Sequence, residues 1–303
     1  MRAAAILGLA SSEKDLRPFQ KASDATWHIG VPASSSNADA ILVFGGDGTV
    51  HRHLAQLVRL QLPVLVVPHG SGNDFARALN LGSVSDSLAA WHSFATGGNN
   101  VRTIDLGFIA PLDAVGAPAL HEPLKPGIGN YFCCVAGVGL DAETARRANQ
   151  LPRWLRGHEG YALSLPSALL RFTPFPVKIS VFDSEKHSAA DSIAGLVMLA
   201  AFANAPAYGG GIRIAPEARL DDGKLDICVV GKLSKLRLLR LFPLVYFGRH
   251  LGIPQVTYFQ TGRLRLETEN PMDVYADGEY VCHTPVEVRV EPAALKVIVT
   301  AGE

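Results

Sequence analysis

The chain has 303 residues, 48% of them hydrophobic and 18% charged, which is typical of a soluble globular protein with a sizeable core. Its length favours two domains over one. The formal net charge is +0, which argues against a nucleic-acid binder because such proteins carry a basic face. No segment reaches the ~18 charge-free apolar residues that a membrane span needs.

The cysteines and the N-terminus indicate a cytoplasmic protein. The four cysteines show no CxxC or CxxH spacing, so we expect reduced, buried thiols: Cys133, Cys134, Cys228 and Cys282. The start MRAAAILGLASSE has the order of a minimal signal peptide, but its apolar run is at the lower length limit. We interpret it as a first buried strand.

The first third of the chain alternates strand and helix patterns. Strands are expected at 2–10, 26–31, 38–46 and 63–70. Helices are expected at 13–22, 49–61, 73–81 and 85–96, the last with Ser85 as its N-cap. Continuous apolar runs such as Ala40–Phe44 are typical of strands buried on both faces. The pattern predicts an α/β domain with a mostly parallel sheet.

From about residue 105 the pattern becomes mostly β. Strands are expected at 101–110, 130–139, 177–183, 193–205, 224–231, 255–260, 263–268, 272–277, 286–291 and 295–300. Helical stretches interrupt them at 142–172 and 234–247, and the Pro- and Gly-rich segment 110–129 is expected to be an inserted loop. A run of mostly antiparallel strands predicts a β-sandwich C-terminal domain.

The stretch ILVFGGDGTVHRH, residues 41–53, indicates a ligand site. Its apolar strand ends at Phe44, at the carboxyl edge of the predicted sheet, where open α/β sheets bind ligands. Glycine lets the backbone approach a bulky anion at Gly45, Gly46 and Gly48. Thr49 would cap the next helix. Asp47 would repel a phosphate unless Mg²⁺ lies between them, so we interpret the stretch as a Mg–nucleotide loop. A plain Gly-Asp-Gly turn is the structural alternative.

The next strand ends in a similar way. A second glycine turn follows it, made of Gly70, Ser71, Gly72 and Asn73. Asp74 then begins a helix, and a third strand, VRTIDLG, places Asp105 at a comparable position. Three carboxylates that converge without a cation would repel one another, so a metal is the more economical explanation.

Seven motifs follow one another along the chain: GGDGT, GSGNDFAR, DLG, GVGLDA, NAPAYGGG, PEARLDDGKLD and DGE. In this order they make residues 40–300 resemble bacterial lipid kinases of the diacylglycerol-kinase catalytic-domain family, whose relatives include sphingosine and ceramide kinases. The resemblance implies a phosphofructokinase- and NAD-kinase-like α/β domain and a β-sandwich lipid-substrate domain. The expected domains are 1–105 with a returning strand 292–303, and 106–291.

The resemblance also implies a set of site residues. The nucleotide phosphates would be bound by Gly45, Gly46, Asp47, Gly48, Thr49, Gly70, Ser71, Gly72 and Asn73. The carboxylates of the Mg²⁺ sites would be Asp47, Asp74, Asp105, Asp222 and Glu279, with the carbonyls of Arg219 and Lys224 beside Asp222. Asp277 would be the catalytic base, with Glu279 beside it. The implied reaction is transfer of the γ-phosphate of ATP to the hydroxyl of a diacylglycerol-like lipid, in which positioning and charge neutralisation do most of the work.

Two features depart from the family pattern. The turn that usually follows the first strand, Asn-Pro-x-Ser-Gly, is not visible, and LASSEKD takes its place in a shorter N-terminal segment. This departure bears on contacts at the adenine and ribose end. Ser71 replaces the usual threonine and keeps the hydroxyl.

A lipid acceptor lies in a bilayer, so we expect a peripheral protein at the inner face of the membrane. Segments 146–158 and 232–250 combine basic residues with Trp, Phe, Tyr and Leu, as interfacial helices do. For each segment taken singly an ordinary amphipathic helix is slightly favoured, and an interfacial role is favoured for at least one of the two. A homodimer is compatible with the sequence.

Other functions stay open. A kinase of the NAD-kinase type shares GGDGT, although GSGNDFAR favours the lipid branch. A nucleotide- or lipid-sensing relative without activity is the non-enzyme alternative. GVGLDA also matches a dinucleotide-binding fingerprint, but the second parallel strand which that motif needs does not follow.

Overall fold

The computed structural model describes residues 1–112, 129–151, 158–182 and 189–300. Most of the expected loop at 110–129 and part of the basic segment 146–158 lie outside the described residues. The chain divides into two compact units, one of residues 1–106 and 292–303 and the other of residues 107–291.

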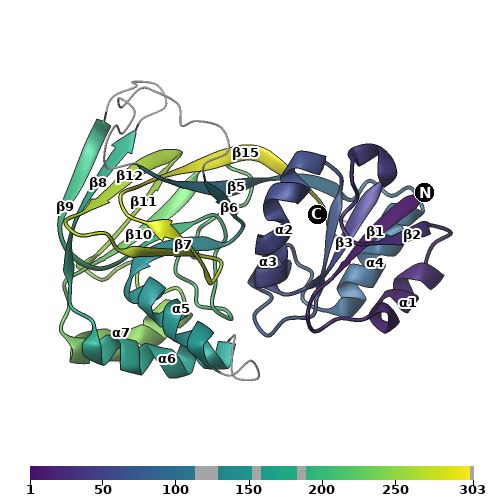
Figure 1. Ribbon diagram of the computed structural model, residues 1–303. Coiled ribbons are helices and arrows are strands. Elements are labelled where there is room, and N and C mark those ends of the chain that lie inside the picture. Colours follow the sequence, from purple (N-terminus) through teal and green to yellow (C-terminus); the bar gives the residue numbers. More distant parts are fainter. Residues whose placement is uncertain (113–128, 152–157, 183–188, 301–303) are drawn as a thin grey trace. The chain divides into compact units, whose positions relative to one another are not determined.

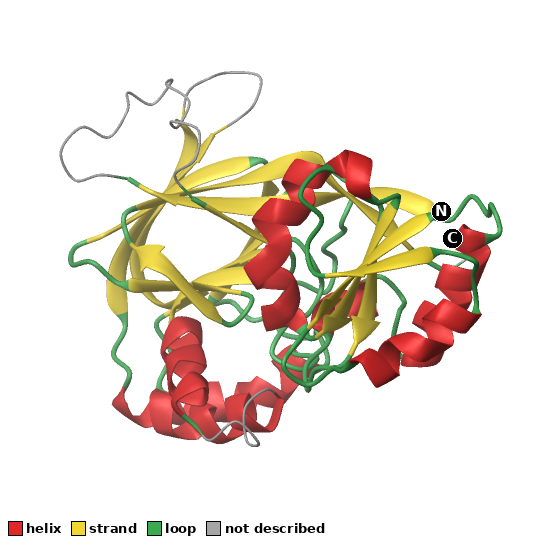
Figure 2. Cartoon of the chain, turned by 45° about the vertical axis from the view of Figure 1, so that its right-hand side comes forward, coloured by secondary structure: helices red, strands yellow, loops and turns green. Residues whose placement is uncertain are grey.

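The first unit is a parallel sheet in the order β2-β1-β3-β4-β15. Its elements are β1 (Arg2–Leu7), α1 (Glu13–Lys21), β2 (Thr26–Ile29), a 3-10 turn (Ser35–Asn37), β3 (Ala40–Gly45), α2 (Asp47–Leu60), β4 (Val64–Pro68), α3 (Asp74–Ala78), α4 (Val84–Ala95), the start of β5 (Val101–Pro111) and the end of β15 (Val286–Ile298). Helices α2 and α3 pack together on one face and α1 and α4 on the other (Figures 1 and 2).

Burial on both faces explains why the central strands are apolar throughout. Every residue of β3 is buried. On the α1 and α4 side, the Phe19 ring meets Phe44 edge-on at 5.1 Å, and Trp91 Nε1 donates to the Phe19 carbonyl over 3.1 Å. This packing holds Phe44, the residue directly before the first glycine turn, in the core.

Two helices begin at residues other than those expected. Helix α2 starts at Asp47 with Gly46 as its N-cap, so Thr49 lies inside the first turn and does not cap it. Ser83, and not Ser85, caps α4. Ser83 Oγ accepts from the Asp86 N–H over 3.2 Å, while Asp86 Oδ2 accepts from the Ser83 N–H over 2.8 Å. This reciprocal capping box stabilises the start of α4 with Ser83 as its N-cap.

In its described residues, the second unit is built from antiparallel strands and three helices. Its elements are β6 (Asn130–Phe132), β7 (Val135–Gly139), α5 (Leu140–Gln150), α6 (His158–Arg171), β8 (Phe175–Phe182), β9 (Ala189–Ala203), β10 (Leu225–Gly231), α7 (Lys235–Tyr246), β11 (Val256–Thr261), β12 (Arg263–Thr268), β13 (Asp273–Ala276) and β14 (Glu279–His283), with parts of β5 and β15. The strand order is β14-β13-β7-β9-β8-β12-β15, with β10 between β9 and β11. Helix α6 contacts both α5 and α7 (Figure 1).

The single strand expected at 130–139 is two strands, β6 and β7, with Cys133 and Cys134 between them. The N–H groups of these cysteines donate to the Asp277 carboxylate. Conversely, the two strands expected at 286–291 and 295–300 form one long strand, β15, in which Ala293 has a positive φ of 52°. Strand β7 pairs antiparallel with β9 and β13, which agrees with rejecting the dinucleotide fingerprint at GVGLDA.

Candidate active site

The two glycine turns touch each other at the ends of β3 and β4. A Cβ added to Gly46 would lie 2.8 Å from the Gly70 Cα, and one added to Gly70 would lie 2.5 Å from the Gly46 Cα. Non-bonded carbon atoms require roughly 3.5–4.0 Å, so any side chain at either position would separate the turns. Both residues must be glycine for the two turns to meet.

The Asp47 side chain, from the first glycine turn, accepts hydrogen bonds from α3, the helix that follows the second glycine turn. Its Oδ2 accepts from the Asp74 N–H over 3.1 Å and its Oδ1 accepts from the Phe75 N–H over 2.9 Å. A carboxylate at the first N–H groups of a helix stabilises both the helix and the anion. Gly72 is close as well, because a Cβ there would lie 2.8 Å from Asp47 Oδ2.

The other residues of the two turns have local structural partners. Asn73 takes the left-handed conformation with φ of 55°. The Gly70 N–H donates to Asn73 Oδ1 over 2.8 Å, and Asn73 Nδ2 donates back to the Gly70 carbonyl over 2.6 Å. Thr49 fills the space beside Gly45, where an added Cβ would lie 2.5 Å from the Thr49 Cβ. Ser71 is exposed on the second turn.

The two other predicted metal carboxylates of this unit, Asp74 and Asp105, each contact a different group. Asp74 is 5% exposed and pairs with Arg77 over 2.5 Å. Asp105 is also 5% exposed, and its Oδ1 accepts from the Ala293 N–H over 2.8 Å. Asp105 therefore stabilises the positive-φ residue in β15.

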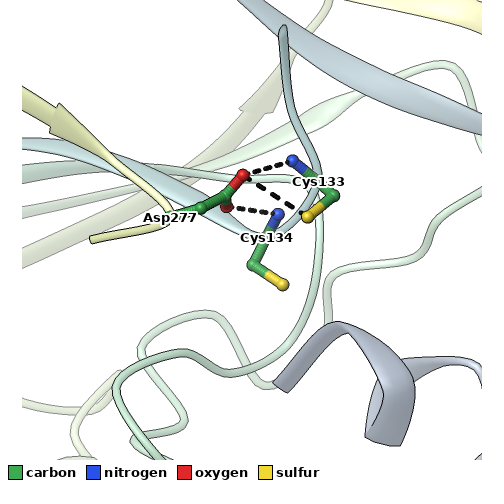
Figure 3. A group of neighbouring side chains, drawn as sticks. All are labelled: Cys133, Cys134 and Asp277. Atoms are coloured by element: carbon green, nitrogen blue, oxygen red, sulfur yellow. Dashed lines mark hydrogen bonds between the residues drawn. The ribbon is translucent and has the colours of Figure 1, made fainter. Parts of the chain in front are cut away.

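In the second unit, the Asp277 carboxylate binds the main chain between β6 and β7 (Figure 3). Oδ2 accepts from the Cys133 N–H over 2.9 Å, and Oδ1 accepts from the N–H groups of Cys134 over 2.8 Å and Val135 over 3.3 Å. The Cys133 thiol lies 3.4 Å from Oδ2. Asp277 has a φ of 50°, which turns the chain into Gly278. The donors orient the carboxylate and stabilise its negative charge.

The other two predicted site residues of the second unit are Glu279 and Asp222. Glu279 is exposed at the start of β14. Asp222 Oδ1 accepts from the Lys224 N–H over 3.1 Å, and its Oδ2 accepts from Gln260 Nε2 over 3.3 Å. Burial raises the pKa of the neighbouring Asp226, and the charge of Asp222 raises it further.

The predicted metal carboxylates are hard oxygen donors, which suit Mg²⁺. Among the described residues, no three of Asp47, Asp74, Asp105, Asp222 and Glu279 bring carboxylate oxygens within 4.8 Å of one another. Mg²⁺ in kinases is usually bound by one or two carboxylates together with substrate phosphates. The expected convergence of Asp47, Asp74 and Asp105 is therefore not found, because Asp74 pairs with Arg77 and Asp105 accepts from the Ala293 N–H. Asp47 alone fits a cation that arrives with nucleotide phosphates.

The sequence analysis missed a polar pair in the second unit. Tyr208 donates to Asp141 Oδ1 over 2.6 Å, and both residues border a small apolar cavity of about 60 Å³ beside α5, α6 and α7. They come from the motifs NAPAYGGG and GVGLDA. Their place in the ordered motif set was the available signal, but nothing in the sequence indicated that they meet.

A parallel sheet with paired glycine turns, together with an antiparallel β unit, places the chain in the NAD-kinase-like class of folds. Residues 2–109 match the diacylglycerol kinase catalytic domain, and residues 134–299 match the YegS C-terminal NAD kinase beta sandwich-like domain. The chain belongs to the diacylglycerol kinase catalytic-domain family. The resemblance inferred from the motifs and the predicted fold class are both confirmed.

Curated relatives and solved structures agree with this assignment. A diacylglycerol kinase of Mycobacterium tuberculosis (strain H37Rv) is 34% identical over 271 residues, which cover 89% of this chain and 80% of the relative. A diacylglycerol kinase of Bacillus subtilis is 28% identical over 261 residues, which cover 86% of this chain and 77% of the relative.

Two solved structures share the fold. The crystal structure of a diacylglycerol kinase from Bacillus anthracis has a TM-score of 0.67 at 18% identity and covers 99% of this chain and 97% of its own. An NAD kinase from Archaeoglobus fulgidus in complex with ATP has a TM-score of 0.54 at 13% identity, with 99% and 94% covered.

Proposed function

We propose that this protein is an ATP-dependent lipid kinase that transfers the γ-phosphate of ATP to the hydroxyl of a diacylglycerol-like lipid. The observation that carries the proposal is the pair of glycine turns tied together by Asp47, in a chain of this family. The turns present main-chain N–H groups at the end of a parallel sheet, and helix α2 begins there, which is where phosphates bind.

Mg²⁺ is the proposed cation. Asp47 would be a ligand in the first unit, Asp222 would hold a second ion in the second unit, and Glu279 would be a metal-facing carboxylate there. When bound, Mg²⁺ would neutralise charge on the nucleotide phosphates. Hydrogen bonds orient the carboxylates of Asp47 and Asp222. Asp74 and Asp105 would support the first unit through their own contacts with Arg77 and Ala293.

Asp277 is the proposed base that accepts the proton of the lipid hydroxyl. The three main-chain N–H groups fix the position of its carboxylate. Positioned general bases contribute roughly 10²–10⁴-fold to rate.

The lipid chains are proposed to enter the second unit at the apolar cavity beside α7. Apart from Asp141 and Tyr208, its lining is apolar, with contributions from α6, α7 and the strands. An apolar lining with few polar groups is typical of sites for hydrophobic ligands.

Helix α7 is proposed to contact the membrane surface. No helix among the described residues is long and apolar enough to cross a bilayer. Exposed apolar side chains lie on and next to α7, where Leu236 is 72%, Leu239 52% and Phe247 66% exposed. Residues 232–255 contain no Asp or Glu and carry five basic residues: Lys232, Lys235, Arg237, Arg240 and Arg249. Basic and apolar groups together favour anionic bilayers.

Vesicle co-sedimentation tests the membrane contact. Leu236→Glu should weaken binding to vesicles that contain anionic lipid, whereas Leu9→Glu, at a leucine 81% exposed in the first unit, should not. Equal binding by both variants would remove α7 from the membrane contact.

Incubation with labelled ATP and a panel of acceptors tests the reaction. The panel holds diacylglycerol, phosphatidylglycerol, sphingoid bases, undecaprenol and NAD. We expect label in diacylglycerol. Label in NAD alone would indicate the NAD-kinase alternative, and no labelled product together with ATP binding would indicate a sensing protein.

A further inference from the structure

Two cysteines and one carboxylate form a compact donor group in the second unit. The ligand atoms of Cys133, Cys134 and Asp277 all lie within 4.8 Å of one another. Among the described residues, no other set of three or more His, Cys, Asp and Glu side chains meets this criterion. Figure 3 shows both cysteines on one short loop that faces the aspartate.

Main-chain hydrogen bonds fix this loop from two sides. Asp277 accepts the N–H groups of Cys133 and Cys134. Asn204, which is fully buried, donates from its main-chain N–H to the Cys134 carbonyl over 2.8 Å and from Nδ2 to the Cys133 carbonyl over 3.2 Å. These bonds fix the main chain that carries the two cysteines and orient the Asp277 carboxylate, as outer hydrogen bonds usually do around metal ligands.

The chemistry of the group differs from that of the magnesium carboxylates. Two sulfurs and one carboxylate oxygen favour Zn²⁺ or Cd²⁺, whereas Mg²⁺ takes only oxygen ligands. Tetrahedral zinc with bonds of about 2.3 Å to sulfur places two sulfurs about 3.8 Å apart, so modest rotation of the cysteine side chains would form the site. Three protein ligands leave a fourth position for water.

We propose that Cys133, Cys134 and Asp277 bind a thiophilic divalent cation of the Zn²⁺ class, and that the bound cation inhibits the enzyme. Binding rests on the geometry of the three side chains. Inhibition rests on the proposed function, because the cation would occupy the carboxylate that accepts the lipid proton. The thiol protons pass to solvent when the cation binds.

Cadmium is the probe for binding, because cadmium–thiolate bonds have a charge-transfer absorption in the ultraviolet. The reduced full-length protein, kept in excess Mg²⁺, should take up a single Cd²⁺ per chain with this absorption, and Zn²⁺ should displace it. Cys133→Ser and Cys134→Ser should each weaken binding at least about tenfold. Cys228→Ser is the matched control, because this buried thiol lies 3.8 Å from His250 Nε2 and outside the group.

Thermal melting of each variant shows whether it is folded before binding is compared. Absence of the absorption band in the wild type, or its persistence in folded forms of both serine variants, overturns the proposal, and so does its loss in Cys228→Ser alone.

Zinc inhibition of ATP turnover is then measured relative to each variant's own rate without zinc. The wild type should be inhibited, and Cys134→Ser much less. Equal zinc inhibition of the wild type and Cys134→Ser would refute the proposal that the bound cation inhibits the enzyme. A wild type with the cadmium band but no kinase activity on any acceptor would refute the proposed function and leave the metal site standing.

Discussion

The Tyr208 hydroxyl donates a 2.6 Å hydrogen bond to Asp141 Oδ1. Asp141 lies in the first turn of α5 and is 7% exposed. The two residues form the polar part of an otherwise apolar cavity lining. A buried carboxylate needs such donors, because burial of a charge without them is costly. The pair therefore supplies both stability and a polar group where we propose that the lipid binds.

Tyr208→Phe removes this hydrogen bond and keeps the ring. We expect the free energy of unfolding to fall by about 1–3 kcal/mol, since a charge-assisted hydrogen bond to a buried group is lost. KM should rise for the lipid and not for ATP. Urea denaturation and steady-state kinetics measure the two effects. Tyr246→Phe is the control, because the Tyr246 hydroxyl makes a longer bond of 3.4 Å to the Gly210 carbonyl. An equal rise in KM for ATP would contradict the placement of the lipid.

Gly70→Ala tests the contact between the two glycine turns. Its Cβ would lie 2.5 Å from the Gly46 Cα, so the turns must move apart. We expect a loss of about 1–3 kcal/mol in unfolding free energy, as for other overpacked sites, together with weaker ATP binding. Gly82→Ala in the same unit is the control, because its nearest contact is an ordinary 3.7 Å to Asp86 Oδ2. ATP affinity equal to that of the wild type would show that the nucleotide does not depend on this contact.

The fold class could be predicted because its signals are local. An apolar run such as that of β3 indicates a strand that is buried on both faces, and the glycine directly after it indicates where the strand ends. The approach of Gly46 to Gly70 also follows, since the ends of neighbouring parallel strands lie at one sheet edge. The first residue of a helix is harder to predict from the sequence. Ser83 and Ser85 are both suitable N-cap residues, and the reciprocal hydrogen bonds between Ser83 and Asp86 place the start at Ser83.

The surroundings of Asp277 could not be predicted from the sequence. The aspartate lies more than a hundred residues from its partners, and nothing in NYFCCVAGVG shows that its strand breaks. The break occurs because a carboxylate from another turn accepts the N–H groups of Cys133 and Cys134. Long-range polar contacts of this kind have no periodicity to detect. The roles of the site residues remain predictions.

The surroundings of Asp277 also change what a substitution there should do. In Asp277→Asn the amide keeps one oxygen, so its NH₂ group would face an N–H donor of Cys133 or Cys134. We expect a loss of about 1–3 kcal/mol in unfolding free energy in addition to a ~10²–10⁴-fold loss of phosphoryl transfer. Rates must therefore be measured where denaturation curves show the variant to be folded.

Glu279→Gln is a control for stability alone, because Glu279 is exposed but is itself a proposed metal ligand. Its unfolding free energy should change by no more than about 0.5 kcal/mol. If folded Asp277→Asn retained activity within about tenfold of the wild type, Asp277 would not be the base.

His250 predicts a loss of stability in mild acid. It is 1% exposed, and its Nε2–H donates to the Ile214 carbonyl over 3.0 Å. Burial lowers the pKa of His250 below its usual 6.5, although the bond to Ile214 opposes the shift. The unfolded chain therefore binds the proton more readily than the folded one. Stability is complete above about pH 6.5 and declines as the pH falls toward the folded-state pKa, by at most about 1.4 kcal/mol per pH unit.

Substitution by glutamine isolates this contribution, because His250→Gln keeps an N–H donor and does not titrate. Melting temperatures measured between pH 5 and 8 should fall less steeply with acid in His250→Gln than in the wild type. His28→Gln, at an exposed histidine, should keep the wild-type dependence. An identical acid dependence in wild type and His250→Gln would mean that other groups control the loss. His250 contacts the Ile214 carbonyl and the Cys228 thiol, which are both uncharged, so protonation would leave a buried positive charge without a counter-charge among these contacts. The acid dependence of the melting temperature should therefore differ measurably between the wild type and His250→Gln.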